Sequence, residues 1–505
     1  MSERMENSPG RTLAPGAAPT RAFVLPVVVA ALALPLLSGA AGAQDFRGQA
    51  WATARTVEVR PIVQDTVSRS QVSELPGGGL AYEGRPVTCT DDECTFYRST
   101  PTEHALHTTG DLRFTAWGFG LEGLSATVHV RGRQDVGGDF TWPQSDDSFD
   151  AIVAYAQYNR PDLRVRLGRQ RTRSGLGFAS YDGASLLAEP LDGLSLEAYG
   201  GRSLARGLHD PRNDALAGVE DFLPDREAWL IGGAATVEGG AGSSLTARYQ
   251  REIFSNRAAL LSERAALDGR TSVLEPVRLT GSVDYDFARG EIGKAHLAAE
   301  LPVTDGIVLE ARGRRYMPYF ELWTIWGLFS PVAYHEARLG ASWAATPDLG
   351  LQVSGGARTY GDTHTDPILG PVEDDAWFAS ASGRWSPATD LQVRGRYRVE
   401  RGAGAFLSSG ELGGRWRASG LLAVRLSLTA SQQIEEFRIG EGMLAGGTAA
   451  VELHPLDGVR LDTGVSMYRQ YFDNRPSAVD WNQLRGWSTV RLDLGGDPAL
   501  EGSSR

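Results

Sequence analysis

The sequence has almost no lysine and carries a net negative charge, and both facts limit the partners that the chain can bind. Lys294 is the only lysine in 505 residues, so nearly all of the positive charge is arginine. The formal net charge is −12, whereas a domain that binds nucleic acid normally carries a basic stripe. We therefore expect no nucleic acid among the partners.

Cysteine is scarce as well. Cys89 and Cys94 are the only two, within the segment VTCTDDECTF, and no Cys-x-x-Cys-His motif for c-type haem attachment is present. In an exported protein, two neighbouring cysteines form a disulfide bond by default. His104 and His107 follow closely, so a Cys₂His₂ metal site is the alternative, although its spacing fits zinc motifs poorly. We expect the disulfide, no metal and no cofactor.

The motifs of the common enzyme classes are missing. The chain has no G-x-x-x-x-G-K-[ST], no H-E-x-x-H and no G-x-S-x-G. Residues 118–123, GFGLEG, formally match G-x-G-x-x-G, but a dinucleotide site needs that loop between a strand and a helix. Alternating sequence lies on both sides here, so we interpret the segment as a hairpin turn and expect no enzyme activity.

Long apolar runs are absent after residue 43, where none reaches the roughly 18 residues that a membrane-spanning helix needs. The one long run, Ala22 to Leu37, follows Arg11 and Arg21 and precedes the small residues SGAAGA. A basic segment, an apolar segment and an Ala-x-Ala site are typical of a cleavable signal peptide. We predict a signal peptide over residues 1–43, with a retained N-terminal anchor as the alternative.

What the chain does contain is glycine and two-residue alternation. Its 61 glycines exceed the roughly 7% of ordinary proteins and suit turns and bends in strands. In residues 390–400, DLQVRGRYRVE, apolar or small residues alternate with arginine, glutamine and glutamate. Successive side chains of a strand point to opposite faces, so this strand would have one apolar face and one charged face.

Similar segments recur from residue 163 to residue 493, with two kinds of connection between them. Residues 160–162, 188–193, 302–306, 345–350, 387–390 and 455–458 are short and turn-like, whereas residues 133–148, 203–226, 255–275, 360–375 and 471–483 are long and polar. Short periplasmic turns alternating with long outer loops are typical of a membrane barrel, and a soluble sandwich gives no reason to segregate loop lengths.

We therefore predict an all-β fold, a transmembrane antiparallel up-and-down β-barrel of about 16–20 strands. The barrel would occupy residues 44–496, with residues 62–103 as an extended loop that carries the disulfide and residues 497–505 as a polar tail. The aromatic stretch from Tyr316 to Tyr334 is interpreted as an interfacial girdle with a loop, and a loop folded into the lumen is the alternative.

Residues 163–183, LRVRLGRQRTRSGLGFASYDG, resemble a wall segment of bacterial outer-membrane porins, in particular alginate-export-like porins, where similar G-R-Q…[FY]-D-G pairs occur. The resemblance implies a location in the outer membrane, contact with its lipid and passive transport of small polar solutes, in a monomer or a homo-oligomer. Many such barrels end on an aromatic residue, whereas here Leu492-Asp493-Leu494 precedes a polar tail.

The arginines of the polar parity are the candidate functional residues. A charge that faces lipid near the midplane costs about 2–4 kcal/mol, so these residues should face the lumen. Guanidinium groups bind carboxylate and phosphate bidentately, and rings of arginine favour anions. The alternative is that they pair across strands with Glu197, Asp284, Asp286, Glu310 and Glu400. The predicted pore-lining set is Arg164, Arg166, Arg248, Arg278, Arg312, Arg314, Arg358, Arg394, Arg396, Arg398 and Arg425.

Two functions from different classes follow. The first is a porin or facilitated-diffusion channel for small polar solutes, anions included, that selects by lumen width and fixed charge. The second is a barrel that serves as a scaffold or sheath for a partner complex, such as a secretion or electron-transfer component. Neither has a chemical step.

Overall fold

The computed structural model describes residues 45–59, 62–74, 80–83, 85–99, 103–136, 149–204, 228–240, 242–255, 260–272, 276–317, 333–361, 374–402, 405–433, 442–472 and 481–495. The predicted signal peptide over residues 1–43 and the predicted polar tail over residues 497–505 lie outside these ranges.

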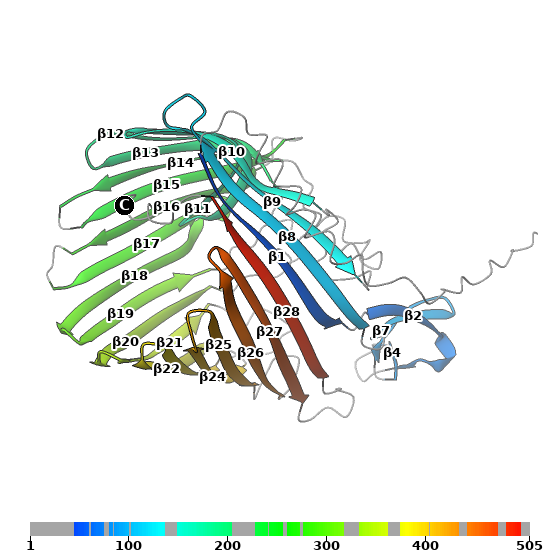
Figure 1. Cartoon of the computed structure of the whole chain (residues 1–505). Coiled ribbons are helices and arrows are strands. Elements are labelled where there is room, and N and C mark those ends of the chain that lie inside the picture. The colour runs from blue at the N-terminus through cyan, green and yellow to red at the C-terminus, as the bar shows by residue number, and fades with distance from the viewer. Residues whose placement is uncertain are drawn as a thin grey trace, which may run out of the picture.

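A closed barrel of 22 antiparallel strands makes up most of the described chain (Figure 1). Each strand pairs with the next one along the ring, and β1 closes the ring by pairing with β28, with Gly48 opposite Leu494. The strands are β1 (Asp45–Val59), β8 (Glu103–Trp117), β9 (Leu124–Val136), β10 (Phe149–Arg160), β11 (Leu163–Ser174), β12 (Gly177–Leu191), β13 (Leu194–Ser203), β14 (Ala228–Glu238), β15 (Ser244–Phe254), β16 (Leu260–Thr271), β17 (Arg278–Asp286), β18 (Glu291–Thr304), β19 (Ile307–Tyr316), β20 (Tyr334–Thr346), β21 (Leu349–Tyr360), β22 (Asp375–Ala388), β23 (Leu391–Gly402), β24 (Ala405–Arg417), β25 (Leu422–Gln433), β26 (Gly442–Leu456), β27 (Val459–Phe472) and β28 (Trp481–Leu494).

The predicted barrel architecture is confirmed, but the ring has more strands than the predicted range of about 16–20. Part of the difference is β16, which lies within residues 255–275, a segment predicted to be a loop. Ala266 on the inner face of β16 is buried, and Ala265 and Leu267 flank it. Because apolar residues stand on both faces there, the two-residue alternation that predicts a strand is weak.

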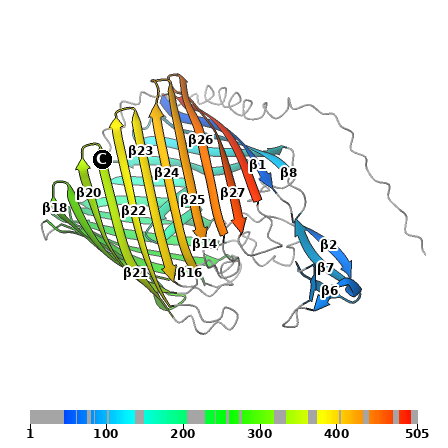
Figure 2. The same ribbon diagram turned by 90° about the horizontal axis from the view of Figure 1, so that it is seen from below.

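The six predicted short connections are confirmed, and each is shorter than predicted, since only residues 161–162, 192–193, 305–306, 347–348, 389–390 and 457–458 separate the consecutive strands. Residues 118–123 connect β8 to β9, as the hairpin interpretation of GFGLEG requires. Gly118, Gly120 and Gly123 all have positive φ values there, a conformation that glycine adopts without steric cost. Figure 2 shows the tilted wall strands side by side.

The connection between β1 and β8 folds into two small sheets, where an extended loop was predicted. One sheet contains β2 (Ile62–Ser68), β7 (Glu93–Ser99) and β6 (Thr88–Thr90), and the other contains β3 (Ser73–Glu74), β4 (Leu80–Tyr82) and β5 (Arg85–Pro86). They lie beyond the ends of β1 and β8, outside the ring (Figures 1 and 2). A short 3₁₀ helix, η2 (Arg69–Gln71), links β2 to β3. Among the described residues, no helix is long and apolar enough to cross a membrane.

A disulfide bond joins Cys89 to Cys94, as predicted, across the directly opposed strands β6 and β7. Cys94 is buried against Val67 and Phe96, which form a small core. This core explains why the segment folds although its sequence looks like a polar loop. On its surface, Arg98 Nε donates to Asp65 Oδ2 at 2.6 Å and lowers the pKa of that carboxyl.

His104 and His107, the alternative metal ligands, lie on β8. Within the described ranges, no group of three or more His, Cys, Asp and Glu residues could hold a metal ion.

Candidate functional site

Contacts between strands that are two apart identify the inner face of the barrel. On the concave side of a closed sheet, side chains of such strands converge across the strand between them. Arg358 Nη1 on β21 contacts Glu400 Oε1 on β23 at 2.6 Å. Arg415 on β24 contacts Glu452 on β26 at 3.3 Å, and Tyr199 Oη on β13 donates to Gln250 Oε1 on β15 at 3.0 Å. Strand alternation places all eleven predicted arginines on this same face.

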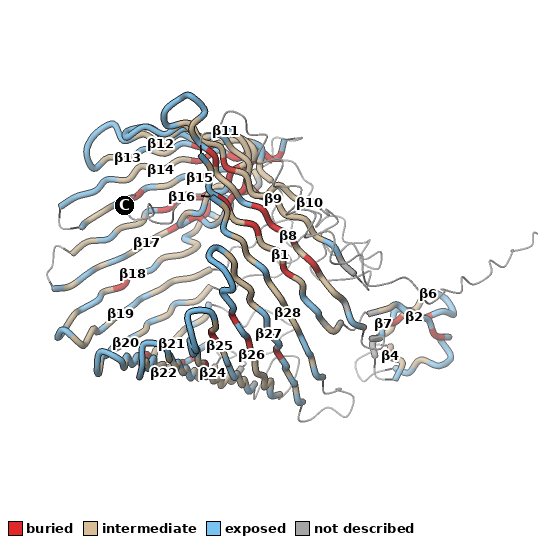
Figure 3. The backbone as a smooth tube through the Cα atoms, viewed as in Figure 1, coloured by how far each residue is buried: buried red, intermediate tan, exposed pale blue. Residues whose placement is uncertain are grey.

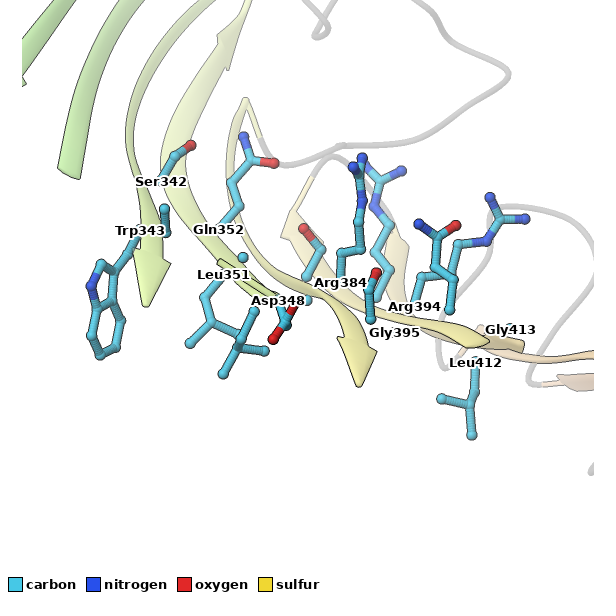
Figure 4. A pocket seen from close by; sticks show the side chains of 18 of the residues that line it. Ser342, Trp343, Asp348, Leu351, Gln352, Arg384, Arg394, Gly395, Leu412 and Gly413 are labelled. Carbon is cyan, nitrogen blue, oxygen red and sulfur yellow. The ribbon is translucent and has the colours of Figure 1, made fainter. Parts of the chain in front are cut away.

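The opposite parity carries the apolar side chains. Figure 4 shows Gln352 and Arg394 projecting to one side of the strands, and Trp343, Leu351 and Leu412 projecting to the other. Large apolar side chains of the outer parity are widely exposed: Leu167 66%, Ile231 61%, Leu297 61%, Leu339 69% and Leu428 61%. The barrel therefore has an apolar exterior and a charged interior.

Five of the eleven predicted arginines have a carboxylate partner. Only Glu400 and Glu310 of the predicted partners serve this set, and Asp284 binds Arg264, which was not predicted. The pairs are Arg248–Asp268 at 3.3 Å, Arg312–Glu310 at 2.6 Å, Arg358–Glu336 at 2.8 Å, Arg358–Glu400 at 2.6 Å, Arg398–Glu400 at 2.5 Å and Arg425–Asp462.

Arg358 is the centre of the largest of these groups. Its guanidinium bridges Glu336 and Glu400 and donates to Tyr360 Oη at 3.1 Å. It also lies 4.7 Å from the ring centroid of Tyr334. Its side chain is 14% exposed and that of Glu336 is 9% exposed, so this group stands in the packed part of the inner wall. Its guanidinium is therefore engaged with partners in the wall.

Arg358→Ala is expected to lower the free energy of unfolding by about 2 kcal/mol, less than the 3–5 kcal/mol of a fully buried pair, because the wall is partly hydrated. Urea titration of the folded barrel in detergent measures it. The matched control is Arg398→Ala, which removes a more exposed arginine from Glu400 and should cost at most about 1 kcal/mol. Equal losses in both variants would contradict the central role of Arg358.

The other six predicted arginines have no such partner: none of the described carboxylates lies within 4.0 Å of Arg164, Arg166, Arg278, Arg314, Arg394 or Arg396. Arg166 Nε donates instead to the neutral Gln157 Oε1 at 2.6 Å, and Arg314 stacks on Tyr316. The pairing alternative therefore explains about half of the set.

Arg394 and Arg396 line a recess of about 1050 Å³ in the inner wall between β19 and β25 (Figure 4). Arg384, which was not predicted, lies in the same recess directly opposite Arg394 on the neighbouring strand. Like charges opposite each other destabilise a sheet, so an anion between them would be stabilising. The acidic residues of the recess, Asp305, Asp348 and Glu411, are not within 4.0 Å of these arginines.

A hairpin between β11 and β12, residues 171–180, leaves the wall and enters the lumen; we call it the inner hairpin. The β10–β11 ladder stops at Ala154–Arg169 and the β12–β13 ladder stops at Tyr181–Ser203. The β11–β12 ladder continues to Ser174–Gly177. The two strands therefore separate from both neighbours but stay paired with each other.

The tip of the inner hairpin reaches β16, four strands further round the ring (Figure 1). Arg264 Nη1 donates to the backbone carbonyl of Leu176 at 2.6 Å, and Leu176 is buried. Near the base, Tyr181 stacks on Tyr199 at 5.7 Å between centroids and packs with Ala179 and Leu230. Figure 3 shows buried residues gathered on this side of the barrel. The hairpin thus narrows the lumen.

A row of three glycines lies where the hairpin leaves the wall. Gly168 is opposite Gly183, and Gly183 is opposite Gly201. A Cβ on Gly183 would lie 2.0 Å from the carbonyl oxygen of Gly200, and Gly168 has φ +126°. The backbones approach so closely that only glycine fits, which permits the inward bend.

The inner hairpin and its base carry Arg169, Arg171 and Arg173 on the face opposite Tyr181. Arg169 binds both oxygens of Asp182, at 2.8 and 2.9 Å, while Arg171 and Arg173 are exposed. The sequence prediction missed all three, although the signal was present. Arginine changes parity across Gly168, and a strand in lipid cannot carry charge on both faces at about 2–4 kcal/mol each.

The aromatic stretch 316–334 is described only at its ends, and residues 318–332 lie outside the described ranges. Tyr316 and Tyr334 face inward with their centroids 5.4 Å apart, and Tyr360 is 5.6 Å from Tyr334. These rings share the parity of Arg314 and Arg358, so the girdle interpretation is wrong for them.

No family model matches the sequence, and no curated protein does. Among solved structures, a variant of the ferric enterobactin receptor of Pseudomonas aeruginosa, bound to enterobactin, has a TM-score of 0.51 and 11% identity over 88% of this chain and 81% of its own. Acinetobacter baumannii OccAB1 has a TM-score of 0.41 and 9% identity over 90% and 98% of the two chains. A BenF-like porin of Pseudomonas fluorescens has a TM-score of 0.38 and 9% identity over 90% of this chain and 100% of its own.

The narrower resemblance to alginate-export-like porins finds no support in these comparisons. At such low identity the likeness shows the fold alone, a large closed β-barrel.

Proposed function

We propose that the protein is an outer-membrane channel through which small polar solutes diffuse passively, with a preference for anions. The observation that carries the proposal is the set of inner-face arginines that have no carboxylate within 4.0 Å in the described part of the chain, to which the recess adds Arg384. Among the described residues, none of these arginines is in ion-pair contact with a carboxylate, although Glu411 stands opposite Arg396 on the neighbouring strand. Their guanidinium donors are therefore available to a passing anion.

The outer face supports a location in a membrane. Trp377 and Trp385 are both exposed on the outer parity of β22, eight positions apart. At about 3.3 Å per residue they are about 26 Å apart along the strand, which is roughly 20 Å of height for a strand tilted by about 40°. This is close to the apolar band of about 25 Å between the aromatic girdles of an outer-membrane barrel. The predicted signal peptide would provide export.

The inner hairpin favours a channel over a sheath. A sheath for a partner protein needs a lumen clear of its own chain, whereas the tip of this hairpin contacts β16 from inside. A narrowed lumen lined by fixed charge instead suits selection of small solutes by size and sign. No chemical step is required of any residue.

Wild-type channels in planar bilayers are expected to give reversal potentials on the anion-selective side in asymmetric KCl. The triple variant Arg384→Gln, Arg394→Gln and Arg396→Gln should lower the anion-to-cation permeability ratio by about fivefold, because the removed charges act on the anion and on the cation with opposite sign. The estimate is three unit charges acting at about 10 Å through water, screened to roughly 0.5 kcal/mol in 0.1 M salt.

Arg401→Gln is the matched control, because Arg401 is exposed on the outer parity of β23. Its permeability ratio should equal that of the wild type. A clear cation preference in the wild-type protein would contradict the proposed selectivity, and absence of conductance would contradict the channel.

A further inference from the structure

The chain's only lysine stands in a small recess beneath the inner hairpin. Lys294 lies on β18 in a recess of about 290 Å³ that the hairpin tip covers through Gly175. His296, Arg312 and Arg314 also line it. A chain that uses arginine almost everywhere thus has its one primary side-chain amine at the point where the lumen narrows.

The two acidic residues of this recess, Asp268 and Asp284, are already bound to arginines. Asp284 Oδ2 accepts from Arg264 Nη2 at 2.5 Å, and its other oxygen accepts from the backbone N–H of Lys294. Asp268 binds Arg248 at 3.3 Å. Among the described residues, no carboxylate lies within 4.0 Å of Lys294 Nζ. The side-chain nitrogen of Lys294 is therefore not held by a carboxylate of the described chain.

Arg314 likewise has no carboxylate within 4.0 Å among the described residues. The residue opposite it on β20 is Glu336, which is bound to Arg358. Arg314 instead stacks on Tyr316, with its guanidinium carbon 4.5 Å from the ring centroid, and Lys294 Nζ is 5.7 Å from that same centroid. One ring thus orients two cations while consuming none of their hydrogen-bond donors.

Neutral groups of the recess complete a polar lining. Ser282 Oγ and His296 Nδ1 are hydrogen-bonded at 2.7 Å, and His296 is exposed. The volume is at the lower end of the range for small-molecule sites, so it suits a few heavy atoms rather than a large ligand.

We infer that this recess binds a small oxyanion, a carboxylate or a phosphate, through Lys294 and Arg314. The planar fork of Arg314 matches the two oxygens of such a group, and the ammonium of Lys294 adds a point charge with rotatable donors. The hairpin tip forms the roof of the site. The inference rests on the proposed channel, in which the site would hold an anion at the narrowest part of its path.

The single lysine permits a direct binding test on the whole folded protein in detergent. Acetylation by an amine-reactive ester is followed by mass spectrometry of the peptide that contains Lys294, and the N-terminal amine is the internal control. Succinate or inorganic phosphate is expected to slow acetylation of Lys294 and to leave the N-terminal amine unaffected. Protection by succinate alone identifies a carboxylate site, by phosphate alone a phosphate site, and by both a general oxyanion site.

Block of the channel current by the same two anions is the second readout. Lys294→Met and Arg314→Met are each expected to weaken the block by about tenfold, the equivalent of one charge-assisted hydrogen bond. Lys294→Arg, which keeps the charge, should retain most of the block, and Arg401→Gln all of it. Equal block of wild type and Lys294→Met, or no protection by either anion, overturns the inference.

The two proposals fail separately. One outcome is that the wild-type barrel conducts and prefers anions, but that neither protection from acetylation nor block of the current depends on Lys294. This outcome supports the proposed function and contradicts the oxyanion site. A barrel that does not conduct contradicts the proposed channel, whereas the acetylation test still reports on anion binding at Lys294.

Discussion

Replacement of residues 171–180 by Asn-Gly is expected to raise the single-channel conductance several-fold. This variant removes the inner hairpin and joins Gln170 to Tyr181, which are opposite each other in the β11–β12 ladder. Asn-Gly is the preferred sequence of a two-residue hairpin turn, so the wall below it should stay intact. The conductance should rise because the hairpin of the wild-type protein projects into the lumen as far as Arg264 on β16.

Two controls separate the effect of lumen width from the effect of the charges on the hairpin. Arg171→Gln with Arg173→Gln keeps the hairpin and should lower the anion preference without the large gain in conductance. Slower gel migration after boiling, which reports unfolding of a barrel, should be the same for all variants. If the shortened protein folds and its conductance is unchanged, the inner hairpin is not the constriction.

Gly183→Ala is expected to destabilise the barrel by at least about 3 kcal/mol, the upper part of the range for overpacked sites. The added Cβ would lie 2.0 Å from the carbonyl oxygen of Gly200 and 2.6 Å from the Cα of Gly201. Both are backbone atoms, which cannot move aside as the end of a flexible side chain can. The loss should appear as a lower urea midpoint, or as failure of the barrel to assemble in detergent.

Gly313→Ala provides the matched control, because a Cβ at this position in β19 meets nothing within 4 Å. Its urea midpoint should stay at or above the wild-type value, since alanine reduces the entropy of the unfolded chain. A Gly183→Ala protein as stable as Gly313→Ala would mean that the glycine row does not constrain the inward bend.

Local features of this protein could be predicted because their physical causes are local. Alternation along residues 390–400 predicted a strand with Arg394, Arg396 and Arg398 on one face, and β23 has that alternation. Two-residue turns and the GFGLEG hairpin depend on backbone preferences within a few residues. The Cys89–Cys94 disulfide depends on short separation in the chain.

The tertiary structure alone decided three things. The number of strands depends on ring closure, and β16 joins the ring despite weak alternation because its two neighbours supply its hydrogen bonds. The pairing of the arginines depends on which carboxylates the neighbouring strands bring close, and two of the six pairs join strands two apart. Arg358 meets Glu400 in this way, whereas Arg394 meets no carboxylate in the described chain.

The third is the inner hairpin. The change of arginine parity across Gly168 indicates that residues 171–180 leave the lipid-facing wall, but it does not show where they go. The course of the hairpin is set by Gly168, Gly183 and Gly201, which come together only when three strands align. Alternation along one strand therefore determined which side chains face inward, because it needs only the geometry of that strand. Closure, charge pairing and constriction needed the register of many strands at once, so only the folded barrel decided them.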